Sequence, residues 1–255
     1  MKPTRIALFA ADRVGLEIAG FIGGRSELTM LILDTADRQG LNQQIIEISR
    51  LPKSRILYGG ELNTADTIEQ LRRADLDLGV LAWWPHIIRS EIIQIPRIGI
   101  LNFHPSFLPY GRGKDPNFWS IVEETPFGVT LHFIDPGVDT GPIAFQREIP
   151  VTWEDTGGSL YQKALREMIL LFKESYAAIL EGRIPRVPQD DRRATSHKRA
   201  ELHDASRIHL DASYSGREVL NLIRARTFPP HPAAWFVDGE EMFEVRVEIR
   251  RMSGS

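Results

Sequence analysis

Apolar residues occur in compact blocks along the first part of the chain, and segments with one polar face separate the blocks. Four apolar runs have the length and composition of strands that are buried on both faces. They span residues 5–10, 28–33, 78–82 and 98–103. The intervening segments that fit helices are 14–22, 41–49 and 64–73. Strands that alternate with helices in this way predict βαβ units and a parallel sheet.

The next part of the chain predicts two more strands and a long helix. Residues 127–135 and 142–151 have the pattern of strands, and a turn rich in Pro and Gly joins them. Apolar residues then recur at helical spacing from 160 to 179, and Gly182 is a typical helix stop.

The pattern changes again in the last third of the chain. Residues 185–209 are rich in Pro, Arg, Asp and His and show little periodicity, which favours a linker or an extended binding segment. A short helix at 216–226 precedes a β-hairpin around the turn dipeptide Asp238-Gly239. We therefore expect an α/β fold with a Rossmann-like parallel sheet flanked by helices over residues 1–183. A C-terminal appendage of linker, short helix and β-hairpin would occupy residues 184–255.

Composition narrows the classes of function. The chain has no cysteine, so disulfides, thiolate catalysis and cysteine metal sites are excluded. The net charge of -3 gives no general attraction for nucleic acid. No apolar run has the length of a membrane span, so we expect a cytoplasmic protein without a membrane partner. His197, His203 and His209 are spaced by six, which fits no metal-ligand pattern, and we predict no metal.

Chemistry-bearing residues gather where the fourth apolar run ends. Asn102 and His104 are two apart, so an extended strand places both side chains on one face. The ends of strands in an open parallel sheet are where ligands bind. The loop Gly111-Arg112-Gly113 follows, and Asp139 lies in the Pro/Gly turn, which can fold back to the same strand end.

Taken one at a time, these residues have ordinary structural interpretations. A histidine at a strand end is often a satisfied structural residue, and Asn or Asp commonly serves the backbone of a turn. The first strand–helix junction lacks the GxGxxG pattern, so a nicotinamide-dinucleotide enzyme loses its main support.

The combination of motifs resembles the formyl-tetrahydrofolate-dependent formyltransferases. That family includes methionyl-tRNA formyltransferase, glycinamide ribonucleotide transformylase and the sugar nucleotide N-formyltransferases. The resemblance covers most of residues 4–182. The matching segments are Asn102-x-His104-Pro105-Ser106-x-Leu108-Pro109, Gly111-Arg112-Gly113, Gly128-Val129-Thr130 and Asp139-Thr140-Gly141-Pro142-Ile143.

This resemblance implies an N-formyltransferase that uses 10-formyl-tetrahydrofolate as co-substrate, with three catalytic residues. Asn102 would hold the formyl oxygen, and His104 would stabilise the developing negative charge and move a proton. Asp139 would orient His104 or accept the proton of the amine through water. Ser106 is expected to shape the loop rather than to act as a nucleophile.

The resemblance also implies where the flat pterin of the folate lies. Two apolar loops with backbone donors and acceptors suit it. The predicted contacts are Trp84, Pro85, His86, Ile87, Ile88, Ile93, Asp135, Gly137 and Val138. An alternative for Trp83 or Trp84 is an ordinary place in the core.

The C-terminal part favours one branch of the family. His197-Lys198-Arg199, Asn221–Ala225 and Pro229–Phe236 resemble the tail of sugar nucleotide N-formyltransferases, although Ala233 stands where glycine is expected. There a short helix and a hairpin often help to form a dimer, so we expect a homodimer. The implied acceptor is a 4-amino-4,6-dideoxy sugar on a nucleotide, with GDP-perosamine favoured and a dTDP-sugar next, for O-antigen or other cell-surface polysaccharide.

A nucleotide diphosphate requires positive charge at its site. We predict substrate contacts from Arg13, Arg112, Lys114 and Asn117, and Lys198 and Arg199 are further candidates. Each cation has the alternative of being a solvated surface charge.

Two other functions stay open. One is a methionyl-tRNA formyltransferase-like enzyme with a shortened C-terminal region, although only about seventy residues follow the predicted boundary, fewer than a full C-terminal barrel requires. The other is a non-catalytic protein that binds folate or a nucleotide sugar.

Overall fold

The computed structural model describes residues 4–252, which form two compact units that interleave along the chain. The first unit comprises the chain up to His104 together with Thr130–Phe145 and Met168–Pro188. The second comprises Pro105–Val129, Gln146–Glu167 and the chain from Gln189 onward. The functional boundary expected near residue 183 stays a prediction.

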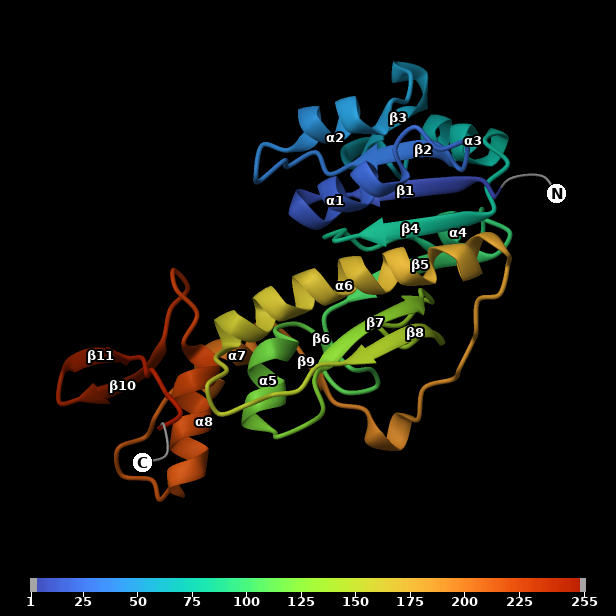
Figure 1. Ribbon diagram of the computed structural model, residues 1–255. Coiled ribbons are helices and arrows are strands. Elements are labelled where there is room, and N and C mark those ends of the chain that lie inside the picture. The colour runs from blue at the N-terminus through green and yellow to red at the C-terminus, as the bar shows by residue number, and fades with distance from the viewer. Residues whose placement is uncertain (1–3, 253–255) are drawn as a thin grey trace. The chain divides into compact units, whose positions relative to one another are not determined.

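A mostly parallel sheet confirms the predicted fold class. Its strand order is β3-β2-β1-β4-β5-β7-β8. The strands are β1 (Ile6–Ala10), β2 (Leu28–Leu33), β3 (Ile56–Tyr58), β4 (Leu78–Ala82), β5 (Gly99–His104), β7 (Gly128–Phe133) and β8 (Ile143–Glu148). The pairs among the first five are parallel, whereas β7 runs antiparallel to β5. Figure 1 shows β1, β2 and β4 side by side at the blue end of the chain.

Helices fill the connections between the parallel strands; the periodicity predicts the first three, and the short helix α4 was not predicted. They are α1 (Asp12–Ile22), α2 (Asn42–Ser49), α3 (Ala65–Arg73) and α4 (Ser90–Ile93). Thr64 caps α3 by accepting a hydrogen bond from the Thr67 amide, which satisfies one of the free N–H groups of the first turn. The helix α6 (Gly157–Leu180) is the long helix that was expected before Gly182. Two 3-10 helices, Lys53–Arg55 and Gly59–Glu61, flank β3.

The C-terminal region contains more structure than a linker. Its elements are a 3-10 helix (Asp191–Arg193), β9 (Ser196–His197), α7 (Glu201–Ala205), α8 (Gly216–Arg226), β10 (Ala234–Asp238) and β11 (Glu241–Val245). The predicted short helix and hairpin are therefore present. Residues 185–209, which were expected to show little regular structure, also contain β9, and β9 pairs with β6 (Arg112–Gly113). The helix α5 (Pro116–Val122) lies in the same unit as this pair.

The core of the first unit follows from side chains that alternate across the strands. Ala7 and Phe9 of β1 and Ile32 of β2 point into one cluster, which Trp84 and Ile100 complete. Within residues 4–252, no helix has the length and apolar character needed to cross a membrane.

Gly79 lets β4 and β5 pack closely near the start of β5, the strand that carries Asn102 and His104. A Cβ atom at position 79 would lie 2.8 Å from Cγ1 and 3.0 Å from Cγ2 of Ile100. Protein interiors are close-packed, so a contact this short forces one of the two strands or the Ile100 side chain to move.

We predict that Gly79→Ala destabilises the protein by about 1–3 kcal/mol through overpacking. Ile100→Ala alone is expected to cost about 2–5 kcal/mol, because it leaves a cavity. The double variant should lose less than the sum of the two, since each change relieves the other. Denaturant unfolding measures all three, and Gly216→Ala, where the added Cβ meets nothing within 4 Å, is the control. Strictly additive losses would contradict this packing argument.

Candidate active site

Asn102 and His104 lie on one face of β5, and their neighbours on β7 are set by the strand register. Asn102 stands opposite His132, and His104 stands opposite Thr130. The residue between them, Phe103, points to the other face and packs on Phe172 of α6, with ring centroids 5.4 Å apart. The strand therefore buries an aromatic ring on one side and presents polar groups on the other.

A shaped turn returns Asp139 to these two residues. The Asp135 carboxylate accepts hydrogen bonds from the Gly137 amide at 3.0 Å and from the Thr140 hydroxyl at 2.6 Å. Gly141 is required after the turn, because a Cβ there would lie 1.8 Å from the Phe133 carbonyl oxygen. Asp139 itself adopts a left-handed conformation, with a φ of 54°.

The three residues expected to act together do lie together. Asp139 Oδ2 is 3.6 Å from His104 Nδ1, and its side chain is 16% exposed. His104 is almost completely buried. A separation of 3.6 Å is longer than a direct hydrogen bond, but it places the carboxylate charge against the ring. A carboxylate in this position fixes the orientation of the ring.

His132 is a fourth member of the site, and the sequence analysis missed it. Its Nε2 lies 3.2 Å from Asn102 Nδ2 and 3.5 Å from Asp139 Oδ1, and its Nδ1 lies 2.9 Å from the Phe133 carbonyl oxygen. A carbonyl only accepts, so this geometry assigns a proton to Nδ1. In the neutral ring, Nε2 then accepts from the Asn102 amide and fixes that side chain. A polar residue inside the apolar run of β7 was the available clue.

Of the nine residues predicted to face the pterin, Asp135 is partly buried in the turn described above, and the other eight fall into two groups. Trp84 and Ile88 are buried in the core cluster of the first unit, and Ile93 packs against that cluster. The Trp84 ring meets Phe9 edge to face at 5.5 Å. The exposed group contains Pro85, His86, Ile87, Gly137 and Val138. Ile87 and Val138 are 89% and 64% exposed, so each loop presents an apolar side chain to solvent.

A histidine–carboxylate pair holds the first of these loops. His86 Nε2 lies 2.8 Å from Oδ1 of Asp34, which directly follows β2 and is buried. Burial alone would raise the pKa of Asp34. Hydrogen bonds from His86 and from the Ala36 amide outweigh it, so the pKa of Asp34 lies below its ordinary value. The pair ties the loop after β4 to the end of β2.

The predicted substrate residues lie in both units. Arg13 is exposed in the first turn of α1, in the first unit. In the second unit, Arg112 is buried and donates to Gln189 and to Asp191 at 2.8–3.0 Å. Its guanidinium is thus committed to the segment that begins at Gln189.

The other two predicted contacts differ from each other in exposure. Asn117 is partly buried and donates through Nδ2 to the Gly157 carbonyl at 2.9 Å. Lys114 is exposed. Of the four residues, Lys114 and Arg13 therefore offer an exposed positive charge.

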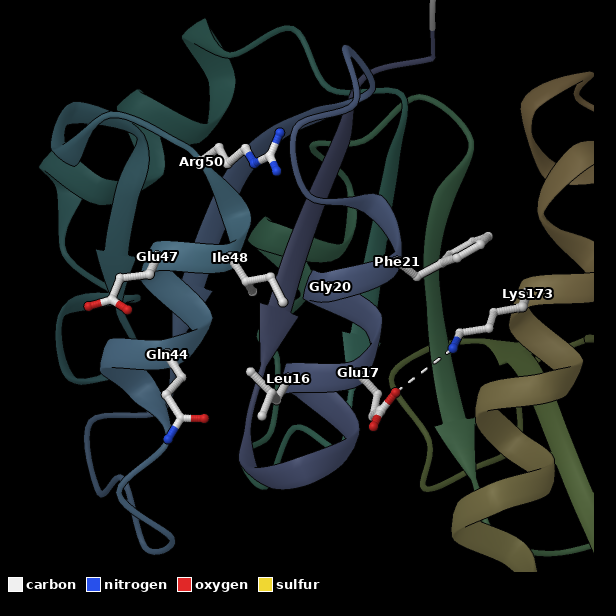
Figure 2. Close-up of a pocket in the computed structure, with 9 residues that line it drawn as sticks. All are labelled: Leu16, Glu17, Gly20, Phe21, Gln44, Glu47, Ile48, Arg50 and Lys173. Carbon is white, nitrogen blue, oxygen red and sulfur yellow. Dashed lines mark ion pairs between the residues drawn. The ribbon is translucent and has the colours of Figure 1, made fainter.

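A groove elsewhere in the first unit contains none of these residues. Its volume is about 690 Å³, and α1, α2 and one residue of α6 line it. Figure 2 shows Ile48 packed toward Gly20 at its centre, with the Lys173–Glu17 ion pair of 3.8 Å at one side. Within residues 4–252, no group of three or more His, Asp or Glu side chains is arranged to hold a metal ion.

Comparison with known proteins places these residues in a family context. Residues 30–172 match the model of the formyl transferase family, and residues 201–251 match the N-formyltransferase dimerization C-terminal domain. Methionyl-tRNA formyltransferase of Listeria monocytogenes serotype 4a is 28% identical over 186 residues, which are 72% of this chain and 58% of that protein. The chain thus spans less than two thirds of the length of this relative.

Two solved structures are similar over most of the chain. A 4-N formyltransferase from Francisella tularensis superposes with a TM-score of 0.82 at 21% identity, over 98% of this chain and 99% of that one. The formyltransferase PseJ of Anoxybacillus kamchatkensis superposes with a TM-score of 0.57 at 26% identity, over 86% and 97%. That structure contains UDP-4,6-dideoxy-4-formamido-L-AltNAc and tetrahydrofolate.

The Asp34–His86 pair predicts a pH dependence of stability. Because the pKa of Asp34 is lowered in the folded state, its contribution is present above the unfolded value of about 3.9 and disappears as the pH falls through the folded value. Asp34→Asn should therefore lower the thermal midpoint at neutral pH, and the difference from the unsubstituted protein should shrink in acid. Asp211→Asn, at an exposed carboxylate, is the control. A difference that is constant from pH 7 to pH 3 would rule out this role for the pair.

Proposed function

The chain belongs to the formyl transferase family, and on that premise we propose that it transfers a formyl group from 10-formyl-tetrahydrofolate to the amino group of a nucleotide-linked 4-amino-4,6-dideoxy sugar. The observation that carries the proposal is the meeting of Asn102, His104 and Asp139 in the first unit, with His104 Nδ1 3.6 Å from the Asp139 carboxylate. Scattered positions would have left each residue with its ordinary structural role.

The geometry suits attack of a neutral amine on the formyl carbon. The attack moves negative charge to the formyl oxygen, and a donor already in place stabilises that charge without reorganisation. The Asn102 amide carries two N–H groups, so one can contact His132 while the other is directed to the oxygen. No covalent bond to the enzyme is required.

His104 and Asp139 manage charge and protons in this scheme. The ring of His104 donates to the developing oxyanion, and the Asp139 carboxylate balances the positive charge of the ring. Asp139 also faces His132 at 3.5 Å, so a second histidine shares the same carboxylate. The proton released by the attacking amine passes to Asp139 directly or through water. When the tetrahedral intermediate collapses, the bond between the formyl carbon and N10 of the folate breaks, and N10 takes up a proton, so that tetrahydrofolate leaves.

Two exposed loops of the first unit are proposed to hold the folate. Pro85, His86 and Ile87 supply one loop, and Gly137 and Val138 supply the other. Exposed apolar side chains such as Ile87 and Val138 gain free energy when a flat ring covers them. Trp84, Ile88 and Ile93 would support the first loop from the core, and Asp135 would shape the second.

The choice of acceptor is supported by the C-terminal region. Residues 201–251 match the C-terminal domain of N-formyltransferases, and PseJ holds a 4-formamido sugar nucleotide in its structure. We favour GDP-perosamine, followed by a dTDP-sugar, and place the reaction in the synthesis of O-antigen or another surface polysaccharide. A second candidate acceptor is methionyl-tRNA, because the relative from Listeria is named methionyl-tRNA formyltransferase.

We predict that Asn102→Ala and His104→Asn each reduce turnover by about 10²–10³-fold, because each removes a group that stabilises the oxyanion. Mass spectrometry of GDP- and dTDP-linked amino sugars incubated with 10-formyl-tetrahydrofolate measures the transfer. His209→Asn, at an exposed histidine of the second unit, is the control and should keep full activity. Unchanged turnover in the first two variants would refute the mechanism.

The same assay separates the acceptors. A formyl group on an amino sugar supports the proposal, whereas a formyl group only on methionyl-tRNA would favour the second candidate. Absence of transfer to every acceptor would instead indicate a protein that binds folate or nucleotide sugar without catalysis.

We further propose that the chain forms a homodimer through its C-terminal hairpin. Phe236 and Phe243 stack across β10 and β11 with centroids 5.3 Å apart, and Phe243 and the adjacent Met242 are 40% and 66% exposed. Exposed apolar side chains gathered on one hairpin are typical of an interface. Met242→Arg should therefore shift the mass measured by light scattering from dimer toward monomer. Leu170→Arg, at an exposed position of α6, should leave the mass unchanged, and a Met242→Arg protein that stays dimeric would refute this interface.

A further inference from the structure

A segment of the C-terminal region is bonded to the loop that follows the catalytic strand in sequence. We call residues 189–201 the strap. The Thr195 hydroxyl and carbonyl accept from the amides of Gly111 and Arg112 at 2.8 and 2.9 Å, and the His197 carbonyl accepts from the Lys114 amide at 3.0 Å. All of these residues belong to the second unit. The strap therefore fixes the backbone of loop 111–114.

Gly113 allows the strap to approach this closely. Its φ is +89°, and a Cβ atom there would lie 2.3 Å from the His197 carbonyl oxygen. A side chain at position 113 would thus push the strap away from the loop. The parallel pairing of Arg112 with Ser196 and of Gly113 with His197 depends on this contact.

His197 anchors the strap to α5. Its ring stacks on the buried ring of Trp119, with centroids 3.6 Å apart and an angle of 8° between the planes. Its Nε2 lies 2.6 Å from Glu123, and its Nδ1 lies 3.0 Å from Glu201. The two carboxylates therefore hold the ring at both of its nitrogens. Glu123 and Glu201 are therefore both engaged by His197, while Asp190 and Asp191 of the strap pair with Arg192 and Arg112.

The register of the strap brings positive charges together. Lys114 and Lys198 directly follow the paired residues Gly113 and His197, the Lys114 amide donates to the His197 carbonyl, and both lysine side chains are exposed. The Arg199 guanidinium lies 3.6 Å from Oδ1 of Asp115. Asp115 also interacts electrostatically with Arg226, and its Oδ2 is buried without a hydrogen-bond partner among the described residues. Lys114, Lys198 and Arg199 thus lie on two paired segments of backbone. Like charges side by side repel one another, and a bound anion removes that cost.

We propose that Lys114, Lys198 and Arg199 form a subsite for the diphosphate of the nucleotide-linked substrate, and that the strap holds them in position. The assignment to a nucleotide sugar rests on the proposed function. Two adjacent phosphates match a compact group of cations, in which lysines act as point charges and arginine as a planar fork. A long polyanion such as RNA requires many more contacts, and the net charge of -3 does not supply them. His197 acts as a positioning residue.

The first test uses nucleoside diphosphates as probes on the full chain. Calorimetric titration compares GDP and dTDP with guanosine and thymidine, which lack the phosphates. The double variant Lys114→Gln/Lys198→Gln should weaken the diphosphates at least about tenfold, since it removes two charge-assisted contacts, and it should leave the nucleosides unaffected. Arg192→Gln is the matched control, because Arg192 lies on the strap, is exposed, and pairs with Asp190 in its own turn.

The second test addresses the positioning role of His197. His197→Ala should speed hydrogen exchange at the amides of Arg112 and Lys114 and weaken the diphosphates by a similar factor. It should raise the KM for the nucleotide sugar while the KM for 10-formyl-tetrahydrofolate stays constant. His209→Ala should change none of these quantities. Unchanged exchange at both amides would overturn the positioning role.

The outcomes distinguish this subsite from the proposed function. Diphosphate affinity that is unchanged in the double variant overturns the subsite, even if the protein formylates an amino sugar. Affinity that depends on the two lysines supports the subsite, even if no sugar gains a formyl group and the proposed function fails. Binding of tRNA that depends on these lysines, without binding of nucleoside diphosphates, overturns the assignment to a diphosphate.

Discussion

The antiparallel pairing of β7 against β5 is the constraint on which the site depends. Its register sets His132 opposite Asn102, and the turn that follows β7 returns Asp139 to the same place. A slip of one residue along β5 would turn Leu101 and Phe103 toward the site and bury Asn102 and His104 in the apolar layer. The packing of Phe103 on Phe172 therefore opposes such a slip and keeps Asn102 and His104 on the side of the candidate site. The core and the site are specified by one register.

Histidine–carboxylate pairs recur wherever the structure holds a loop in place. Asp139 faces His104 and His132, Asp34 faces His86, and Glu123 and Glu201 face His197. A carboxylate beside an imidazole ring holds the orientation of that ring. The same interaction thus serves two ends in this chain. At Asp139 it is proposed to orient the ring of His104 for catalysis, and at His86 and His197 it fixes loops that are proposed to contact the two substrates.

The parts of the fold that could be predicted are those with local patterns. The buried strands could be predicted from apolar runs. Asn102 and His104 could be identified as site candidates because they are polar residues at the end of such a run. The strand β3 was missed, because three residues are too short for periodicity to register. Arg112 was expected at the substrate, but its partners Gln189 and Asp191 lie 77 and 79 residues further along the chain. Residues 185–209 were predicted as a linker or an extended binding segment, but their pairing with loop 111–114 was not predicted, because main-chain hydrogen bonds constrain few of the side chains.

The main-chain hydrogen bonding of the strap affects how the sequence of this protein can diverge. Because Thr195 and His197 hold loop 111–114 largely through backbone carbonyls, most side chains of the strap are free to vary without loosening it. Selection to preserve this backbone arrangement would act on Gly113, on the length of the strap, and on Thr195 and His197. Positions 198 and 199 would be held only by the charge that the proposed diphosphate subsite requires. The backbone of the strap could thus be preserved while its other exposed side chains change.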